Sequence, residues 1–183
     1  MLGDGLEEPW ILTDSEHALV LTKKRNNRLG FAILLVFFRI NGRFPQSDLD
    51  VSPQGILSLR KQLETFVPQD CEPFPKGRTF ERMRAEIRIK FGFREATVTD
   101  AEMLTAWLRD HVAGEIVNDM ALMAPRLEAR CRELSIEPPA PDRVERIIRS
   151  ALHTHFDHFH KQIFEKLPPI TREKLDALLC PEK

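Results

Sequence analysis

The feature that most constrains this chain is one strongly apolar segment, residues 29–40, which lies between basic residues. Its side chains are apolar around nearly the whole helical wheel, so a helix formed here would be buried on all sides. Asn41 and Gly42 follow it, and glycine readily takes the left-handed conformation that ends a helix. A strand of eight apolar residues is the alternative, because periodicity alone does not separate the two. The total length and the Asn-Gly stop favour a central helix over residues 26–41.

The same segment is too short to cross a bilayer, which takes about 20 apolar residues. The N-terminus carries acidic residues where a secretory signal would be basic, so nothing predicts export. The three cysteines, Cys71, Cys131 and Cys180, are widely spaced and form neither a metal-binding pattern nor a disulfide framework. These features predict a folded, water-soluble, cytoplasmic chain that makes no contact with a membrane.

Helix signals continue on either side of the apolar segment. Thr13 and Glu16 have the spacing of a capping box, which predicts a short helix over residues 14–24. Ser52 and Pro53 read as an N-cap and first turn, and apolar residues at helical spacing then continue to Phe66. Residues 68–75 hold three prolines, which stop regular structure and predict a subdomain boundary near Cys71.

The rest of the chain shows further helical patterns and no convincing β-pattern. Gly92 is expected to cap the first of them, and Pro125 predicts a kink or a boundary within the third. We therefore expect an all-α fold of two small subdomains. The first, residues 1–70, would be a three-helix unit of helix-turn-helix type, and the second, residues 71–183, a helical bundle. The expected helices of the second subdomain cover residues 79–91, 100–112, 114–134, 142–167 and 171–179.

Basic residues gather in two stretches although the formal net charge is only -1. Residues 23–43 contain six basic side chains and no acidic one, and residues 76–94 contain seven against two glutamates. Such clusters attract phosphate and release counterions when they bind DNA. The alternative is that they are solvated helix faces, which are common. The basic residues are Lys23, Lys24, Arg25, Arg28, Arg39 and Arg43 in the first stretch, and Lys76, Arg78, Arg82, Arg84, Arg88, Lys90 and Arg94 in the second.

Several short motifs occur in the same order as in one known family. They are Leu29-Gly30-Phe31-Ala32, Arg39-Ile40-Asn41-Gly42-Arg43-Phe44-Pro45, Glu86-Ile87-Arg88, Phe91-Gly92-Phe93-Arg94, Trp107-Leu108, Ile136-Glu137-Pro138-Pro139, Arg146-Ile147-Ile148-Arg149-Ser150-Ala151 and Leu175-Asp176-Ala177-Leu178-Leu179. Together they make the chain resemble the N-terminal region of Tn-three-type transposases from about residue 10 to residue 180. Met83 departs from the pattern, because a histidine is expected there and a polar contact is then absent.

The resemblance implies sequence-specific binding of the terminal inverted repeats of a transposon, in a protein associated with the nucleoid. It also implies that a separate C-terminal domain with an acidic triad carries out catalysis. This chain is therefore expected to be a catalytically inert fragment without a cofactor. Its expected partners are double-stranded DNA and, through the full-length transposase, other copies of itself. The alternative is a module for transposase assembly whose basic faces are incidental.

Individual residues can be given roles on this reading. The helix that begins at Pro53 would offer Gln54, Ser58, Arg60 and Lys61 to a groove, while Arg25, Arg28 and Arg43 contact the backbone. Solvation of a packed helix is the alternative for Arg60 and Lys61. Arg82 or Arg84 could bind guanine through two hydrogen bonds. The predicted DNA-binding residues are Lys23, Lys24, Arg25, Arg28, Arg43, Gln54, Arg60, Lys61, Arg78, Arg82, Arg84 and Arg88.

Four histidines, His153, His155, His158 and His160, lie close together in the sequence. A pair of them could chelate a metal ion, but no cysteine or carboxylate set completes a tetrahedral site nearby. We therefore expect solvated or packed imidazoles and no biological metal. The acidic residues are scattered, so no catalytic constellation is predicted.

Overall fold

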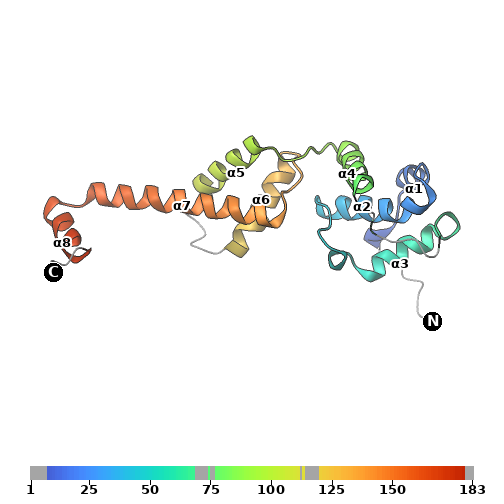
Figure 1. Cartoon of the computed structure of the whole chain (residues 1–183), viewed down its shortest axis with the longest axis horizontal. Helices are drawn as coiled ribbons and strands as arrows, with labels where there is room; N and C mark the ends of the chain where they lie inside the picture. The colour runs from blue at the N-terminus through green and yellow to red at the C-terminus, as the bar shows by residue number, and fades with distance from the viewer. Residues whose placement is uncertain (1–7, 69–73, 75–76, 112, 114–119, 180–183) are drawn as a thin grey trace. The chain divides into compact units, whose positions relative to one another are not determined.

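The chain is all-α, as predicted. The computed structural model describes residues 8–68, 74, 77–111, 113 and 120–179, which form eight α-helices and no strand (Figure 1). None of these helices combines the length and apolar character needed to span a membrane. The chain forms two compact units: unit 1 is Met1–Ala96 with Cys131–Pro138, and unit 2 is Thr97–Arg130 with Pro139–Lys183.

Unit 1 is built around α2 (Arg28–Asn41), against which three other helices pack: α1 (Asp14–Leu21), α3 (Pro53–Gln62) and α4 (Arg78–Phe91). Every residue from Leu29 to Phe38 is buried, which confirms the central helix and excludes the strand. Gly42 ends α2 with a φ of 65°, the left-handed conformation expected of it.

Local signals define where the helices begin. The Thr13 hydroxyl accepts from the Glu16 N–H at 3.3 Å and the Glu16 carboxylate accepts from the Thr13 N–H at 2.9 Å, so the capping box is present. The Ser52 hydroxyl caps α3 by accepting from the Gly55 N–H at 3.2 Å. Helix α1 ends at Leu21, earlier than predicted, and a short 3-10 turn over Arg25–Asn27 leads into α2.

The division into units differs from the expected boundary at residue 70. Helix α4, expected in the second subdomain, belongs to unit 1 because Met83 and Ile87 are buried in the same core as α2. The first unit therefore holds four helices instead of three. The connection from Gly42 to Ser52 is longer than the three or four residues typical of a helix-turn-helix. The boundary predicted near Cys71 lies outside the described residues.

A later segment, residues 131–138, completes unit 1. It forms a single parallel β-bridge between Arg94 and Ile136, with the Arg94 N–H donating to Ser135 O at 3.0 Å. Arg132 donates to Asn41 O at 3.1 Å, and its side chain covers Gly42 so closely that a Cβ there would lie 2.7 Å from Arg132 Cδ. The segment is thereby tied to the end of α2.

In unit 2, α5 (Val98–His111) packs along α7 (Pro141–Lys166). Helix α6 (Met120–Glu133) contains Pro125 within its span, so of the two predicted alternatives, a kink or a boundary, the boundary is excluded and the kink stays a prediction. Burial of Met123 and Leu127 on either side of the proline offsets the local cost of about 3 kcal/mol. Helix α8 (Pro169–Leu179) follows, close to the expected range.

We expect Gly55→Ala to lower the free energy of unfolding by about 2 kcal/mol, because it overpacks a buried aromatic contact. A Cβ at residue 55 would lie 2.5 Å from Cδ2 and Cε2 of Trp10, a buried ring. Urea denaturation measures the change. The neighbouring exposed substitution Gln54→Ala should change stability by less than about 0.5 kcal/mol. Equal stability of the two variants would contradict the contact.

Candidate nucleic-acid interface

The arginines of α4 divide into two groups by helical position. Arg78 and Arg82 are one helical turn apart and both are exposed. Arg84 and Arg88 are also one turn apart, but they flank the face that packs on α2 and are partly buried. The single basic stretch seen in the sequence therefore becomes two surfaces with different surroundings.

Arg84 and Arg88 both bind the buried carboxylate of Glu137, whose side chain is 7% exposed. Arg88 Nη1 donates to Glu137 Oε2 at 2.5 Å, and Arg84 also pairs with this carboxylate. The Arg84 guanidinium lies 5.0 Å from the ring centroid of Phe44. This cluster holds the segment 131–138 on unit 1, so we leave Arg84 and Arg88 out of the candidate interface.

Arg28 also stabilises the fold. Its guanidinium donates to the backbone carbonyls of Lys23 at 3.1 Å, Leu21 at 2.9 Å and Phe66 at 3.1 Å. The bond to Leu21 O satisfies a carbonyl in the last turn of α1, which has no partner within the helix. Arg28 thereby joins the end of α1 to Phe66, in the turn that follows α3. Contact of Arg28 with DNA stays a prediction.

Acidic partners partly neutralise two other predicted residues. Arg43 pairs with Asp50 at 3.2 Å. The Gln46 N–H donates to Asp50 and, together with Arg43, holds the pKa of that carboxyl below its ordinary value. Lys23 pairs with Glu86 of α4, and its ammonium lies 4.6 Å from the ring centroid of Phe31.

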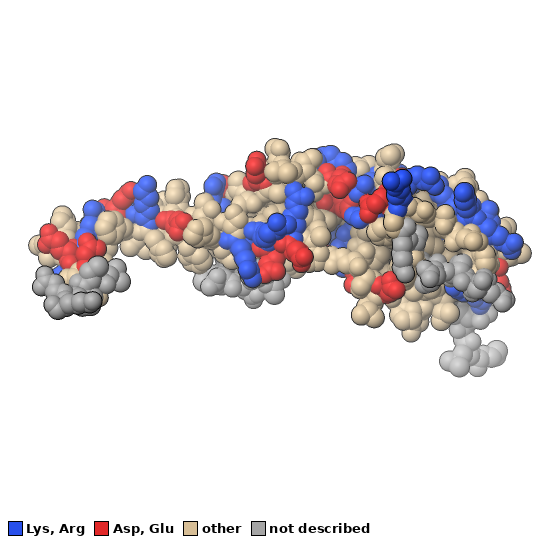
Figure 2. Space-filling view, viewed as in Figure 1, with Lys and Arg blue, Asp and Glu red and all other residues tan. Residues whose placement is uncertain are grey.

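A small notch brings together basic residues that are far apart in the sequence. It has a volume of about 270 Å³ and lies between the turn after α1 and the edge of α4 that carries Arg82, Met83 and Glu86. Lys24 and Arg82 are its exposed cations, and neither forms an ion pair within the described part of the chain. Figure 2 shows Lys and Arg side chains following one another over the region where Figure 1 places α1 and α4. The residues that line the notch are Thr22, Lys23, Lys24, Asn27, Arg82, Met83 and Glu86.

The residues predicted on α3 lie on another side of unit 1, since α3 and α4 pack on opposite sides of α2 in Figure 1. Gln54 and Lys61 are exposed, as a groove-reading role requires. Ser58 was expected to be available but is buried, and its hydroxyl lies 3.2 Å from Gln62 Nε2. The Ser58 prediction was therefore wrong, because this face of α3 packs against the 3-10 turn Glu8–Trp10.

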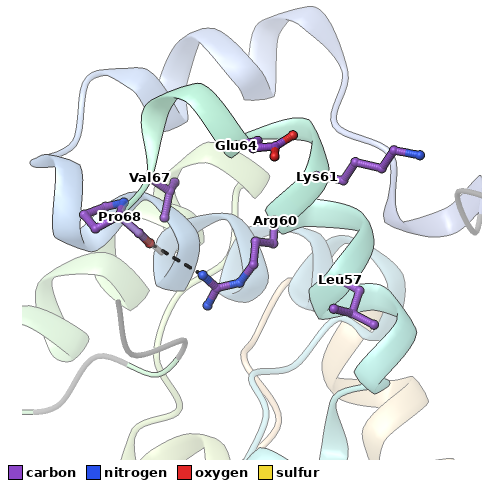
Figure 3. A pocket seen from close by; sticks show the side chains of 6 residues that line it. All are labelled: Leu57, Arg60, Lys61, Glu64, Val67 and Pro68. Carbon is purple, nitrogen blue, oxygen red and sulfur yellow. Dashed lines mark hydrogen bonds between the residues drawn. The ribbon is translucent and has the colours of Figure 1, made fainter. Parts of the chain in front are cut away.

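A pocket of about 560 Å³ lies beside α3 (Figure 3). Arg60 reaches toward Pro68 and donates to its carbonyl at 3.5 Å, whereas Lys61 points away from it. Leu57, 64% exposed, and Glu64 also line the pocket. The pocket has two cations and one carboxylate, whereas the notch has three cations and one carboxylate, so the pocket is the less basic of the two surfaces.

The histidines of α7 belong to no candidate metal site among the described residues. Across the described ranges, no group of three or more His, Cys, Asp or Glu side chains could hold a metal ion. His153 lies 3.3 Å from Asp157 one helical turn later, and both side chains are exposed.

A comparison with protein families adds one finding. Residues 3–151 match the profile of a family described as "Domain of unknown function (DUF4158)". The chain belongs to this family. No curated protein matches the chain. The match covers all described residues of unit 1 in this DUF4158 member, including the notch and the Glu137 cluster. The transposase resemblance stays a prediction.

The role of Glu137 was not predicted from the sequence. It lies 49 residues after Arg88 in a proline-rich segment, and no local pattern relates it to a basic helix. Met83, by contrast, behaves as the sequence predicts: it is buried in the wall of the notch, and its side chain supplies no polar contact among the described residues.

We expect Glu137→Gln to lower the free energy of unfolding by about 3 kcal/mol, because it removes the one buried counter-charge of two partly buried guanidinium groups and leaves them only the exposed carboxylates of Glu81 and Glu95. The matched control is Glu95→Gln: Glu95 pairs with the same Arg88 at 3.5 Å but is 77% exposed. Its loss should change stability by less than about 1 kcal/mol. Thermal and urea denaturation of both variants measure the difference, and similar values would show that the buried cluster does not stabilise unit 1.

Proposed function

We propose that unit 1 binds duplex DNA through the notch and the outer face of α4, as the N-terminal recognition region of a Tn-three-type transposase. The observation that carries the proposal is that Lys24 and Arg82, which are far apart in the sequence, line the same notch with exposed side chains. Arg25 follows Lys24 in the sequence and Arg78 lies one helical turn before Arg82, and both side chains are exposed. We call these four residues, Lys24, Arg25, Arg78 and Arg82, the outer basic set.

The charge of the outer basic set is available to a ligand. All four side chains are exposed, and none forms an ion pair within the residues that the structure describes. Cations without an internal counter-charge attract phosphates and release counterions on binding. This local excess explains how a chain with a net charge of -1 could bind a polyanion.

Helix α4 suits the role of the element that enters the major groove. Its inner side is fixed on α2 by Met83 and Ile87, so its outer side is held in one orientation. Arg82 on that outer side can form two hydrogen bonds with guanine, the commonest specific contact. Ile89, exposed to 79%, is an apolar group that could contact a thymine methyl.

The transposase context rests on the ordered motifs that resemble Tn-three-type transposases. Terminal inverted repeats are the DNA that the resemblance implies, and catalysis would belong to another domain. The chain by itself would then bind DNA without cutting it, in the cytoplasm and near the nucleoid.

We expect the double variant Lys24→Ala/Arg82→Ala to weaken duplex binding and to reduce the slope of log K against log salt by about 2. Titration by fluorescence anisotropy at several salt concentrations measures both effects. The control Lys161→Ala/Lys174→Ala removes the same charge from exposed positions on α7 and α8. An unchanged slope in the first variant would remove the outer basic set from the interface.

Specificity is tested separately with Arg82→Lys, which keeps the charge but loses the planar fork that binds guanine. Affinity for an inverted-repeat duplex should fall toward that for a scrambled duplex by about 1–3 kcal/mol, while affinity for the scrambled duplex stays constant. Competition titrations with the two duplexes give this ratio. If the unmodified chain binds both duplexes equally, sequence-specific recognition is excluded; if it binds neither, DNA binding is excluded.

A further inference from the structure

The second half of α7 lacks cover. Helix α7 has 26 residues, and its buried residues, from Val144 to Leu152, all lie in the first half. Among the described residues 153–178 none is buried. Figure 1 shows α7 continuing as a single helix beyond α5, with α8 at its end. This half of α7 therefore gains little stability from packing against the other described residues.

It nevertheless carries an apolar stripe. Phe156, Phe159 and Ile163 form the stripe, and they continue from the buried Leu152 at intervals of four, three and four residues, which is the spacing of a coiled-coil seam. Phe159 is 50% exposed and Ile163 is 43% exposed. Helices of this length are marginal in water unless an apolar face is buried. The stripe is thus a surface that a second helix would stabilise.

The residues beside the stripe are polar but carry no fixed charge. His153 and His160 border it on one side, and His155 and Gln162 on the other. The charged side chains of the same turns, Asp157, Lys161 and Glu165, lie on the opposite face. The stripe ends one turn later, at Lys166, where α7 also ends.

Helix α8 does not cover the stripe. Arg172 holds it to the end of α7 by donating to Leu167 O at 3.0 Å and to Glu165 O at 2.7 Å. The Arg172 guanidinium also lies 4.9 Å from the ring centroid of Phe164. Large apolar side chains of α8 remain exposed, among them Ile170, Leu175 and Leu178.

We propose that this stripe pairs with the same stripe of a second copy of the chain. In a two-fold symmetric contact the same surface meets itself, so its flanks must not repel one another. Imidazole and amide side chains carry no fixed charge and so meet that condition, whereas selection of a different partner usually relies on complementary charges, which the flanks lack. The paired region, residues 153–166, would be about 21 Å long, which predicts a small interface and a weak dimer. This inference does not depend on the proposed DNA binding.

The test is sedimentation equilibrium of the 183-residue chain between about 1 and 200 μM. The mean mass should rise with concentration toward twice the monomer mass. The variant Phe159→Ser/Ile163→Ser should raise the dissociation constant at least about tenfold. Phe159→Leu/Ile163→Leu, which keeps the stripe apolar, should retain the dimer.

The matched control is Asp157→Ser/Lys161→Ser, on the opposite face of the same turns, and it should leave the dissociation constant unchanged. Circular dichroism checks that all variants stay helical. A chain that remains monomeric across the range would overturn the proposal. So would a dimer that the stripe variant does not weaken, since another surface would then form it.

Discussion

The structure of unit 1 depends on the complete burial of α2. A helix with ten consecutive buried residues has no side left for water, so other elements must cover every face. Helices α1, α3 and α4 supply most of that cover, and the segment 131–138 covers the C-terminal end at Gly42. The return of a segment so distant in sequence follows from this requirement. A three-helix unit would leave part of α2 exposed.

The same constraint determines which arginines face solvent. Met83 and Ile87 place one side of α4 on the core, which leaves Arg78 and Arg82 on the outside. Arg84 and Arg88 lie between these two sides, where a guanidinium is partly removed from water. Such a charge requires a partner, and Glu137 supplies one for both. The arginines of α4 therefore have two different roles. Their angle around the helix determines whether they face solvent or form a structural ion pair.

Much of the fold could be predicted from local sequence, because caps and periodicity act over a few residues. Thr13 with Glu16, Ser52 with Pro53, and the glycines at 42 and 92 define helix ends that the structure confirms. Contacts between distant residues could not be predicted. The position of α4 in unit 1 and the pairing of Glu137 depend on how the helices pack. Pro125 is tolerated within α6 because Met123 and Leu127 beside it are buried, and that burial exists only in the folded chain.

The candidate site, like the fold, could be predicted only in its local features. Its basic stretches are visible in the sequence, but the sequence does not distinguish Arg82 from Arg84, two residues apart on one helix. Likewise, Ser58 is polar and next to predicted groove residues, yet its hydroxyl lies beside Gln62 within the fold. Identifying an interface requires knowing which charges the fold itself neutralises, and that follows only from tertiary structure.

The two proposals concern different units, and their energetic effects would combine. A single surface with four cations would bind DNA weakly at physiological salt, since each neutralised phosphate contributes a salt-sensitive increment. Pairing through α7 would join two such surfaces, and the second would then bind at a raised effective concentration. A weak dimer would suffice, because DNA that bound both copies would itself favour the paired state. Linkage makes this effect reciprocal: whatever factor dimerisation adds to DNA affinity, DNA adds to dimerisation.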